Sequence, residues 1–307
     1  MTDSPRDYAL FGLRICSALP LPEMPHAPGG GGAADVDVRL GPVDVPAGPG
    51  GYAPTPGGTV LTIENVGRFL IRDGREVTID PAPGASERNL RLFLLGSAFG
   101  AVLHQRGLMP LHANAVVIDG RAFAFCGHSG AGKSTMAAWF HDRGHPILAD
   151  DVCVVGFDAD TVPLAYPGVP RLRLWRQALE ESGRFVDDYE RSFDALDKYD
   201  VPISSEDRTD PVPLAAVYLL AKAEEDAKAG TIHRLAGIDA VETLVSNTYR
   251  GAYLASIGGT GPHLAACVRI ARSVPIFRAE RRWGFDAFDA EAGRLHDHAL
   301  SLAQGAR

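Results

Sequence analysis

The chain has 307 residues, 46% of them apolar and 22% charged, which is an ordinary balance for one large globular domain or two modest ones. A formal net charge of −8 without any basic run argues against a general nucleic-acid-binding protein. No apolar run approaches the roughly 18 residues of a membrane span, and the N-terminus has no signal-peptide pattern. We therefore expect a cytoplasmic protein that acts on neither nucleic acid nor membrane.

The beginning of the chain is expected to be rich in β-structure. Short β-prone runs are bounded there by segments rich in glycine and proline, which is typical of strands joined by loops. We expect a β-rich accessory region over residues 1–84 and a catalytic domain over residues 85–307. The β-prone runs are residues 8–16, 36–40, 59–63, 68–71 and 77–79.

A long helix is predicted at residues 89–106. Its apolar side chains recur at three- and four-residue spacing, Ser86 is a suitable N-cap, and Gly107 is a suitable end. This helix should pack on the core.

Two β-prone runs follow, residues 111–118 and 121–126, and Asp119-Gly120 lies between them. This arrangement predicts a β-hairpin. In most doubly wound sheets a helix, not an antiparallel neighbour, precedes the strand that leads into a glycine-rich loop. The hairpin therefore predicts an α/β fold with a mixed sheet.

Residues 127–134 match the phosphate-binding pattern G-x-x-x-x-G-K-[ST]. In such a loop the backbone N–H groups surround phosphate oxygens, Lys133 reaches the outer phosphates and the Ser134 hydroxyl can ligate Mg²⁺. The strand-like run 121–126 precedes the loop and a helical run at 135–143 follows it, as this function requires. A nucleoside triphosphate is the expected ligand. The predicted binding residues are Gly127, His128, Ser129, Gly130, Ala131, Gly132, Lys133, Ser134 and Thr135.

Asp150 and Asp151 form a second motif, directly after the β-prone run 147–149. Asp150 follows Lys133 by 17 positions, which leaves room for one helix and one strand. The acids should therefore return to the sheet edge that carries the loop, where α/β sheets bind ligands. One carboxylate can hold the hydration shell of Mg²⁺ while the other takes a proton from an attacking hydroxyl. The alternative for an isolated acid pair is a solvated turn.

Histidines supply further candidates. His112 lies at the start of the hairpin strand whose partner enters the loop, with a histidine bonded within the fold as the alternative. His128 occupies a variable position of the loop. Two other pairs have metal-like spacing, but the one near the C-terminus has no third ligand and Gly144 and Pro146 interrupt the other, so we expect surface residues and no structural zinc. These pairs are His141 with His145 and His296 with His298.

The cysteines show no C-x-x-C spacing, and we expect them to be reduced and structural. Lys198, one of four lysines, and Arg250 are candidates for further phosphate contacts, with ordinary surface charges as the alternative. Later elements are predicted as a strand at 213–221, helices at 237–246 and 261–272, and a strand at 274–278.

Three segments together resemble the catalytic core of the HPr kinase/phosphorylase family. They are LHANAV at 111–116, GHSGAGKST at 127–135 and RGHPILADDV at 143–152. They are particularly similar to the shorter HPr-kinase-like serine kinases of bacterial peptide-tailoring clusters, which include the lasso-peptide kinases. Residues 168–175 and 247–250 resemble the same branch less specifically.

The resemblance implies a P-loop domain with a mixed sheet, related to phosphoenolpyruvate carboxykinase. It implies use of ATP and Mg²⁺ to phosphorylate a serine of a peptide or small protein. It also implies roles for five residues. Lys133 would bind phosphate, Ser134 the metal, Asp150 would be the base, Asp151 a metal-side acid and His112 a polar support near the reacting phosphate.

The sequence departs from the HPr enzymes themselves. Thr135 stands where those enzymes typically have glutamate, and their HPr-contacting signature has no counterpart near the C-terminus. The resemblance therefore favours another acceptor, such as the C-terminal serine of a lasso-peptide precursor. Two alternatives stay open, a kinase for a sugar or nucleoside and a nucleotide-gated binding module without transfer activity. No oligomeric state is predicted.

Overall fold

The computed structural model describes residues 5–28, 32–45, 50–192, 197–203, 210–225, 227–257 and 259–305. The chain divides into two compact units. The first consists of Met1–Pro110 and Tyr249–His263, and the second of Leu111–Thr248 and Leu264–Arg307.

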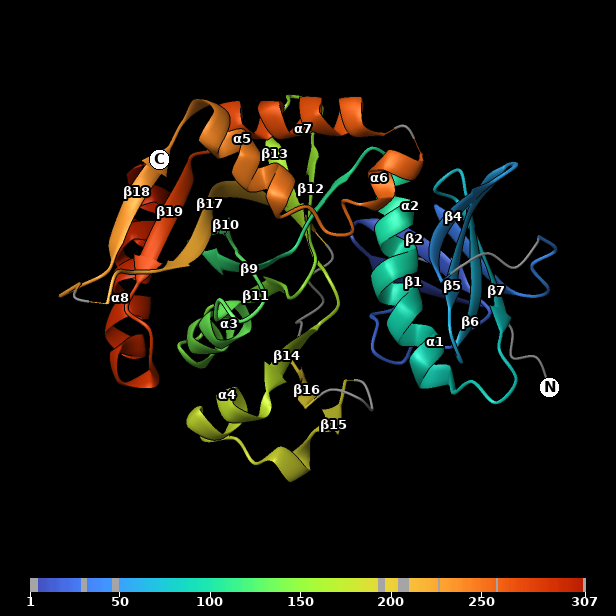
Figure 1. Cartoon of the computed structure of the whole chain (residues 1–307), viewed down its shortest axis with the longest axis horizontal. Helices are drawn as coiled ribbons and strands as arrows, with labels where there is room; N and C mark the ends of the chain where they lie inside the picture. Colours follow the sequence, from blue (N-terminus) through green and yellow to red (C-terminus); the bar gives the residue numbers. More distant parts are fainter. Residues whose placement is uncertain are drawn as a thin grey trace. The chain divides into compact units, whose positions relative to one another are not determined.

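The first unit contains a β-sheet with the strand order β1-β2-β3-β7-β6-β5-β4 (Figure 1). Neighbouring strands are antiparallel except for β3, which runs parallel to both β2 and β7. The strands are β1 (Arg6–Leu10), β2 (Leu13–Ser17), β3 (Val36–Leu40), β4 (Gly51–Thr55), β5 (Gly58–Ile63), β6 (Gly67–Arg72) and β7 (Glu76–Pro81).

The predicted β-rich region is confirmed, with two differences. The run 8–16 is not one strand, because the backbone turns at Phe11 and Gly12 and folds β2 back on β1 as a hairpin. Strand β4 was not predicted. It has proline at position 54 and sits at the edge of the sheet, where a missing N–H donor is tolerated.

The predicted helix at 89–106 is confirmed as a continuous helical stretch, α1 (Glu87–Phe93), η1 (Leu94–Ala98) and α2 (Phe99–Gln105). The Ser86 hydroxyl accepts a hydrogen bond from the N–H of Asn89 at 3.2 Å and so caps the stretch as expected. A π-helical turn at η1 interrupts the regular α-helical bonding, and the apolar spacing did not indicate it.

This helical stretch belongs to the first unit, although the sequence placed it in the region 85–307. Its contacts with the β-sheet explain this position, because the Tyr52 hydroxyl of β4 donates to the Ser97 carbonyl at 2.7 Å. The returning segment of the first unit carries α6 (Tyr253–Ser256), where the Tyr253 and Thr59 hydroxyls lie 3.0 Å apart.

The second unit is built on a larger sheet with the strand order β11-β9-β10-β17-β13-β12-β8, in which β19 also pairs with β17 and β18 with β19. The strands are β8 (Met109–Leu111), β9 (Ala113–Ile118), β10 (Arg121–Cys126), β11 (Ile147–Ala149), β12 (Cys153–Phe157), β13 (Pro163–Tyr166), β17 (Val212–Lys222), β18 (Thr231–Leu235) and β19 (Ile276–Arg281).

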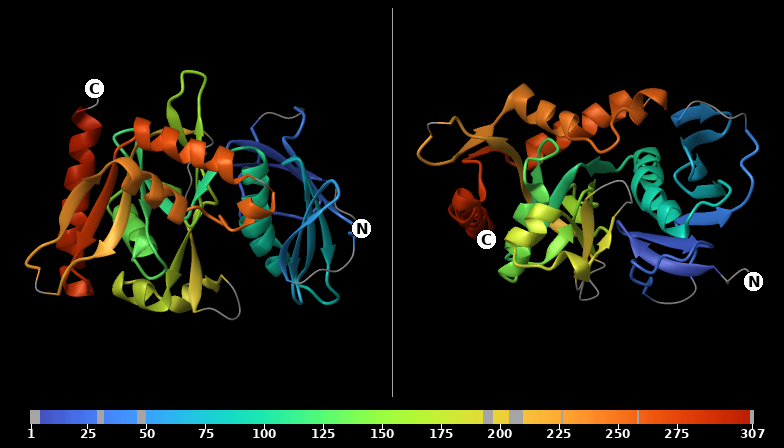
Figure 2. Two further views of the ribbon diagram at one scale, coloured as in Figure 1. Left: turned by 45° about the horizontal axis from the view of Figure 1, so that its top comes forward. Right: turned by 60° about the horizontal axis from the view of Figure 1, so that its bottom comes forward.

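The pairing confirms both the predicted hairpin and the mixed α/β sheet. Strands β9 and β10 are antiparallel and joined through Asp119-Gly120, whereas β10 is parallel to β17, and β17 is parallel to β19. Helices lie on both sides of this sheet, with α3 and α8 on one side and α5 and α7 on the other (Figures 1 and 2). They are α3 (Lys133–Asp142), α5 (Gly237–Ser246), α7 (Thr260–Ser273) and α8 (Phe285–Gly305).

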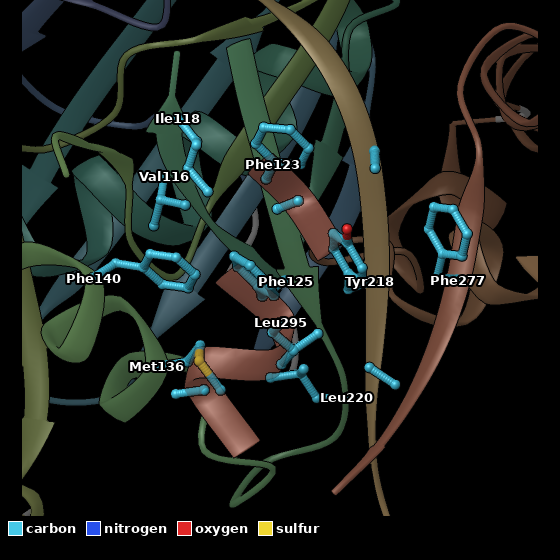
Figure 3. Close-up of a cluster of buried hydrophobic side chains, with 14 of the residues drawn as sticks. Val116, Ile118, Phe123, Phe125, Met136, Phe140, Tyr218, Leu220, Phe277 and Leu295 are labelled. Carbon is cyan, nitrogen blue, oxygen red and sulfur yellow. The ribbon is translucent and has the colours of Figure 1, made fainter. Parts of the chain in front are cut away.

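The core of the second unit fixes β10, the strand that leads into the glycine-rich loop. Its Phe125 ring stacks on Phe140 of α3 at 5.4 Å and on Tyr218 of β17 at 5.3 Å between ring centroids. Met136 of α3 and Leu295 of α8 complete this buried cluster (Figure 3). Burial of these large side chains from four elements holds β10 and α3 together.

A smaller sheet in the same unit was not predicted. It has the order β14-β16-β15, and two short helices lie between β14 and β15 in the chain. Its elements are β14 (Arg171–Trp175), α4 (Arg176–Glu181), η2 (Val186–Asp188), β15 (Glu190–Arg191) and β16 (Lys198–Pro202). Helix α8 was also not predicted. No helix in the described part of the chain is long and apolar enough to cross a membrane.

All four cysteines are free thiols, and three of them, Cys126, Cys153 and Cys267, are buried. Burial raises the pKa of Cys126 and of Cys153 to about 12. These thiols therefore stay protonated and act as small apolar side chains.

Candidate active site

The glycine-rich loop joins the end of β10 to the start of α3, in the order that the sequence predicts. Gly132 is the N-cap of α3, and no side chain caps this helix end. The first N–H groups of the ten-residue helix are therefore left for another acceptor, and their partial positive charge favours an anion.

Lys133 is folded back onto this loop. Its side chain is buried, and its ammonium group donates to the carbonyl oxygens of Gly127 at 2.7 Å and His128 at 3.2 Å. Burial lowers the pKa of Lys133, while the charge of Asp151 opposes that shift. Among the described residues its hydrogen-bond acceptors are neutral carbonyl groups, so this buried cation is well placed to bind phosphate.

A cavity of about 390 Å³ opens beside the loop. It brings together residues that the sequence singled out in three separate segments. Those that line it are His112, Ser129, Gly130, Gly132, Lys133, Ser134, Thr135 and Asp151. The remaining predicted site residues, Gly127, His128, Ala131 and Asp150, do not line the cavity.

Asp150 lies behind the cavity wall, 9% exposed, at the end of β11. Its Oδ1 accepts a hydrogen bond from the Ser134 hydroxyl at 3.4 Å, and its Oδ2 accepts one from the backbone N–H of Arg173 at 2.6 Å. Burial, followed by the negative charge of Asp151, raises the pKa of Asp150 to about 6. The hydrogen bond from Ser134 shows that the Asp150 carboxylate is turned towards the serine at the end of the loop.

Asp151 faces the cavity and has different partners. Its Oδ2 accepts from the Arg173 guanidinium at 3.3 Å, and its Oδ1 lies 3.3 Å from Nδ1 of His112. Burial would raise its pKa, but the charges of Arg173, His112 and the nearby lysines hold the pKa of Asp151 below the usual value. Its backbone is left-handed, with a φ of 70°, an unusual conformation that is common at functional sites.

His112 contacts both the backbone carbonyl and the side-chain carboxylate of Asp151. Its Nδ1 lies 3.0 Å from the carbonyl oxygen of Asp151, so the ring can donate there. Burial lowers the pKa of His112, and the charge of Asp151 opposes the shift. The ring is therefore a polar contact of Asp151 on the cavity wall.

The sequence pattern did not identify two arginines that lie at the site. Arg173 of β14 binds both acids, one through its backbone and one through its guanidinium, and Asp200 of β16 holds the same guanidinium at 3.3 Å. The weak resemblance at 168–175 was the one sequence signal for it. Nothing in the sequence pattern indicated the second, Arg281.

Arg281 ends β19 beside the loop and is 4% exposed. Its guanidinium donates to the carbonyl of Ala131, and its Nε has no hydrogen-bond partner among the described residues. Burial lowers the pKa of Arg281 to about 10. Trp283 and Phe288, each with its ring centroid 5.8 Å from this guanidinium, line the same side of the cavity.

Of the other candidate residues from the sequence, one lies at the cavity and the others lie elsewhere. Lys198 lines the cavity and lies 5.3 Å from the ring of Trp175. Arg250 belongs to the first unit and is not among the lining residues. His128 is exposed, with Nδ1 2.8 Å from the Ser129 carbonyl oxygen, and His298 bonds to the Tyr218 hydroxyl at 2.7 Å.

The side chains around Ser134 fit a magnesium ion. Ser134, Asp150 and Asp151 supply hydroxyl and carboxylate oxygens, the ligand atoms that Mg²⁺ prefers. Mg²⁺ usually keeps several waters and uses one or two carboxylates together with substrate phosphates, so a complete protein cage is not required. The described residues contain no cluster of three or more His, Cys, Asp or Glu suited to a metal.

The chain was compared with protein-family models, curated proteins and solved structures. No protein-family model matches the chain, and no curated protein matches it. Among solved structures the chain is similar to the Hpr(Ser) kinase/phosphatase from Coxiella burnetii, with 14% sequence identity and a TM-score of 0.34. The similarity covers 63% of this chain and 97% of that one.

Proposed function

We propose that this protein is an ATP- and Mg²⁺-dependent kinase that transfers a phosphoryl group to a serine of a peptide. One observation carries the proposal, namely that a single cavity joins a phosphate-binding loop to a carboxylate paired with a histidine and an arginine. Phosphoryl transfer needs positioning, charge neutralisation and a base, and these groups supply all three.

The proposed nucleotide lies along the loop. Lys133 and the free N–H groups of α3 bind its phosphates, and Arg281 binds them from the β19 side. Ser134 and Asp150 hold the metal side of the site, because the serine hydroxyl already donates to that carboxylate. Bound Mg²⁺ would neutralise phosphate charge as it builds up. Trp283 also lines the cavity, and its ring is proposed to stack on the nucleobase.

We assign the base to Asp151, which differs from the role that the family resemblance implies. Asp150 is turned towards Ser134 and the backbone of Arg173, whereas Asp151 lines the cavity. A base must reach the proton that it removes, so geometry decides before pKa does. The charge of Arg173 keeps Asp151 ionised, and the contacts with Arg173 and His112 orient its carboxylate.

The proposed reaction moves one proton and one phosphoryl group. Asp151 takes the proton of the serine hydroxyl while the serine oxygen bonds to the γ-phosphorus. The bond from that phosphorus to the β,γ-bridging oxygen breaks, and Lys133 and Arg281 stabilise the negative charge left on the diphosphate. The products are a phosphoserine peptide and ADP.

The cavity favours a peptide over a small enclosed acceptor. Its volume of about 390 Å³ is at the low end of small-ligand sites, so a nucleotide would occupy much of it. The acceptor would then approach on the side of Trp175, which lines the cavity and is 44% exposed. With the motif resemblance, this supports the C-terminal serine of a lasso-peptide precursor as the candidate acceptor.

The test is a transfer assay with Mg²⁺ and ATP. We expect a phosphate-sized mass increase on a serine-bearing precursor peptide and none on the same peptide with alanine in place of that serine. Lys133→Ala should abolish transfer and weaken ATP binding about 10- to 100-fold, because it removes a charged hydrogen-bond donor.

The alternatives give different results in the same assay. Transfer to sugars or nucleosides but to no peptide would indicate a small-molecule kinase. ATP binding without transfer to any acceptor would indicate a nucleotide-gated binding module. Unchanged transfer by Lys133→Ala would exclude the loop from the reaction.

A further inference from the structure

Asn114 is a buried polar side chain on the wall of the cavity. It is 1% exposed, and neither its amide oxygen nor its amide nitrogen has a hydrogen-bond partner among the described residues. A buried amide that makes no hydrogen bond costs stability, so native proteins rarely keep one. The residues described so far give it no role.

Its place in the sheet directs Asn114 to the helix α3 side. It lies on β9 opposite Phe125 of β10, and alternate residues of a strand share a face. Val116 and Ile118 follow on that face, and both belong to the buried cluster that includes Met136 and Phe140 of α3 (Figure 3). An apolar residue would be the expected choice at position 114, as it is at the next two positions of this face.

The neighbours on the cavity wall identify the chemistry that the amide faces. Asn114 lines the cavity together with His112, Lys133, Ser134 and Asp151. Of these, Lys133 is proposed to bind the phosphates and Ser134 to hold the metal, while Asp151, oriented by His112, is the proposed base. A neutral amide has an acceptor for metal-bound water and a donor for phosphate oxygen, and it adds no charge to a site that already has two acids.

We propose that the Asn114 side-chain amide binds the hydrated Mg²⁺–phosphate end of the nucleotide. This inference rests on the proposed function and adds a residue to its binding site. It also explains why the amide has no partner among the described residues, because the ligand would supply those hydrogen bonds. Asn114 would then lower stability without ligand and raise affinity with it.

A matched pair of variants tests this trade-off. Val and Thr have nearly the same shape and both suit a strand, but only Thr keeps a polar group. Without ligand, we expect Asn114→Val to melt above Asn114→Thr, by roughly 2 °C or more. In calorimetric titrations with Mg²⁺ and ATP, we expect Asn114→Val to bind about 10- to 100-fold more weakly than the natural protein, and Asn114→Thr to be intermediate.

Val116→Thr is the control, since it places a hydroxyl on the same face of β9 away from the cavity lining. It should lower the melting temperature and leave the dissociation constant of ATP unchanged. The inference is overturned if Asn114→Val binds within about twofold of the natural protein, or if the Val and Thr variants bind equally weakly. Failure of the natural protein to bind Mg²⁺ and ATP would instead overturn the proposed function.

Discussion

Asp150 and Asp151 are adjacent and chemically identical, yet the structure gives them different surroundings. Asp150 is covered and bonded to a hydroxyl and an N–H group, while Asp151 meets a guanidinium and an imidazole at the cavity. The pKa of Asp150 is raised and that of Asp151 is lowered. Opposite shifts in a pair of acids are the usual sign of separate roles.

The two isosteric amide variants separate these roles. Asp151→Asn should reduce kcat about 10²- to 10⁴-fold while ATP affinity stays within a few-fold, because it removes the base and little binding. Asp150→Asn should mainly raise the Mg²⁺ concentration needed for half-maximal rate. Steady-state kinetics at varied Mg²⁺ measures both quantities. A normal kcat for Asp151→Asn would show that the base is elsewhere.

At the scale of elements, the strand–loop–helix unit from β10 to α3 was predictable because its signals are local. The glycine pattern, the preceding apolar run and the following helix all lie within about 25 residues of sequence. The same holds for the hairpin at Asp119-Gly120. The sheet β14-β16-β15 was not predictable, because it depends on pairing of segments about 25 residues apart that carry no strong turn signal.

Gly127 illustrates what the loop requires of one position. Its φ is 145°, and an added Cβ would lie 2.9 Å from the carbonyl oxygen of Leu220 on β17. Gly130 also has a positive φ, 83°, but an added Cβ there would meet no atom within 4 Å. Alanine at position 127 therefore meets both backbone strain and a clash.

We expect Gly127→Ala to lower the free energy of unfolding by about 2–3 kcal/mol and Gly130→Ala by about 1 kcal/mol. Urea denaturation of the ligand-free variants measures both values. Because only the first forces the loop away from β17, only the first should also displace β10 from its packing. Equal losses for the two variants would contradict the clash at Leu220.

At the scale of the whole molecule, buried histidines should make the stability depend on pH. His104 of α2 is 7% exposed, and its Nε2 donates to the Tyr249 carbonyl at 2.8 Å. Burial lowers the pKa of His104 below its usual 6.5. The nearby His263, 5.9 Å away between ring centroids, has a lowered pKa for the same reason.

The direction of this pH dependence follows from the linkage between proton binding and folding. A lowered pKa means that the unfolded chain takes up the proton first as the pH falls, so the stabilisation is complete above pH 6.5 and is lost below it. We expect His104→Gln to lose more stability at pH 7.5 than at pH 5, because only the natural side chain has this proton linkage. Urea denaturation at the two pH values tests it, and an equal loss at both would contradict the buried neutral imidazole.

The sequence by itself determined the strand–loop–helix unit around the glycine-rich loop, the hairpin that makes the sheet mixed, and the return of the acid pair towards the loop. These follow from backbone rules that act over short stretches of chain. Only the tertiary structure decided which acid faces the cavity, that Arg173 and Arg281 flank it, and that the Asn114 amide is left unpaired. Those properties depend on burial and on partners far away in sequence, and a residue pattern does not encode either one locally.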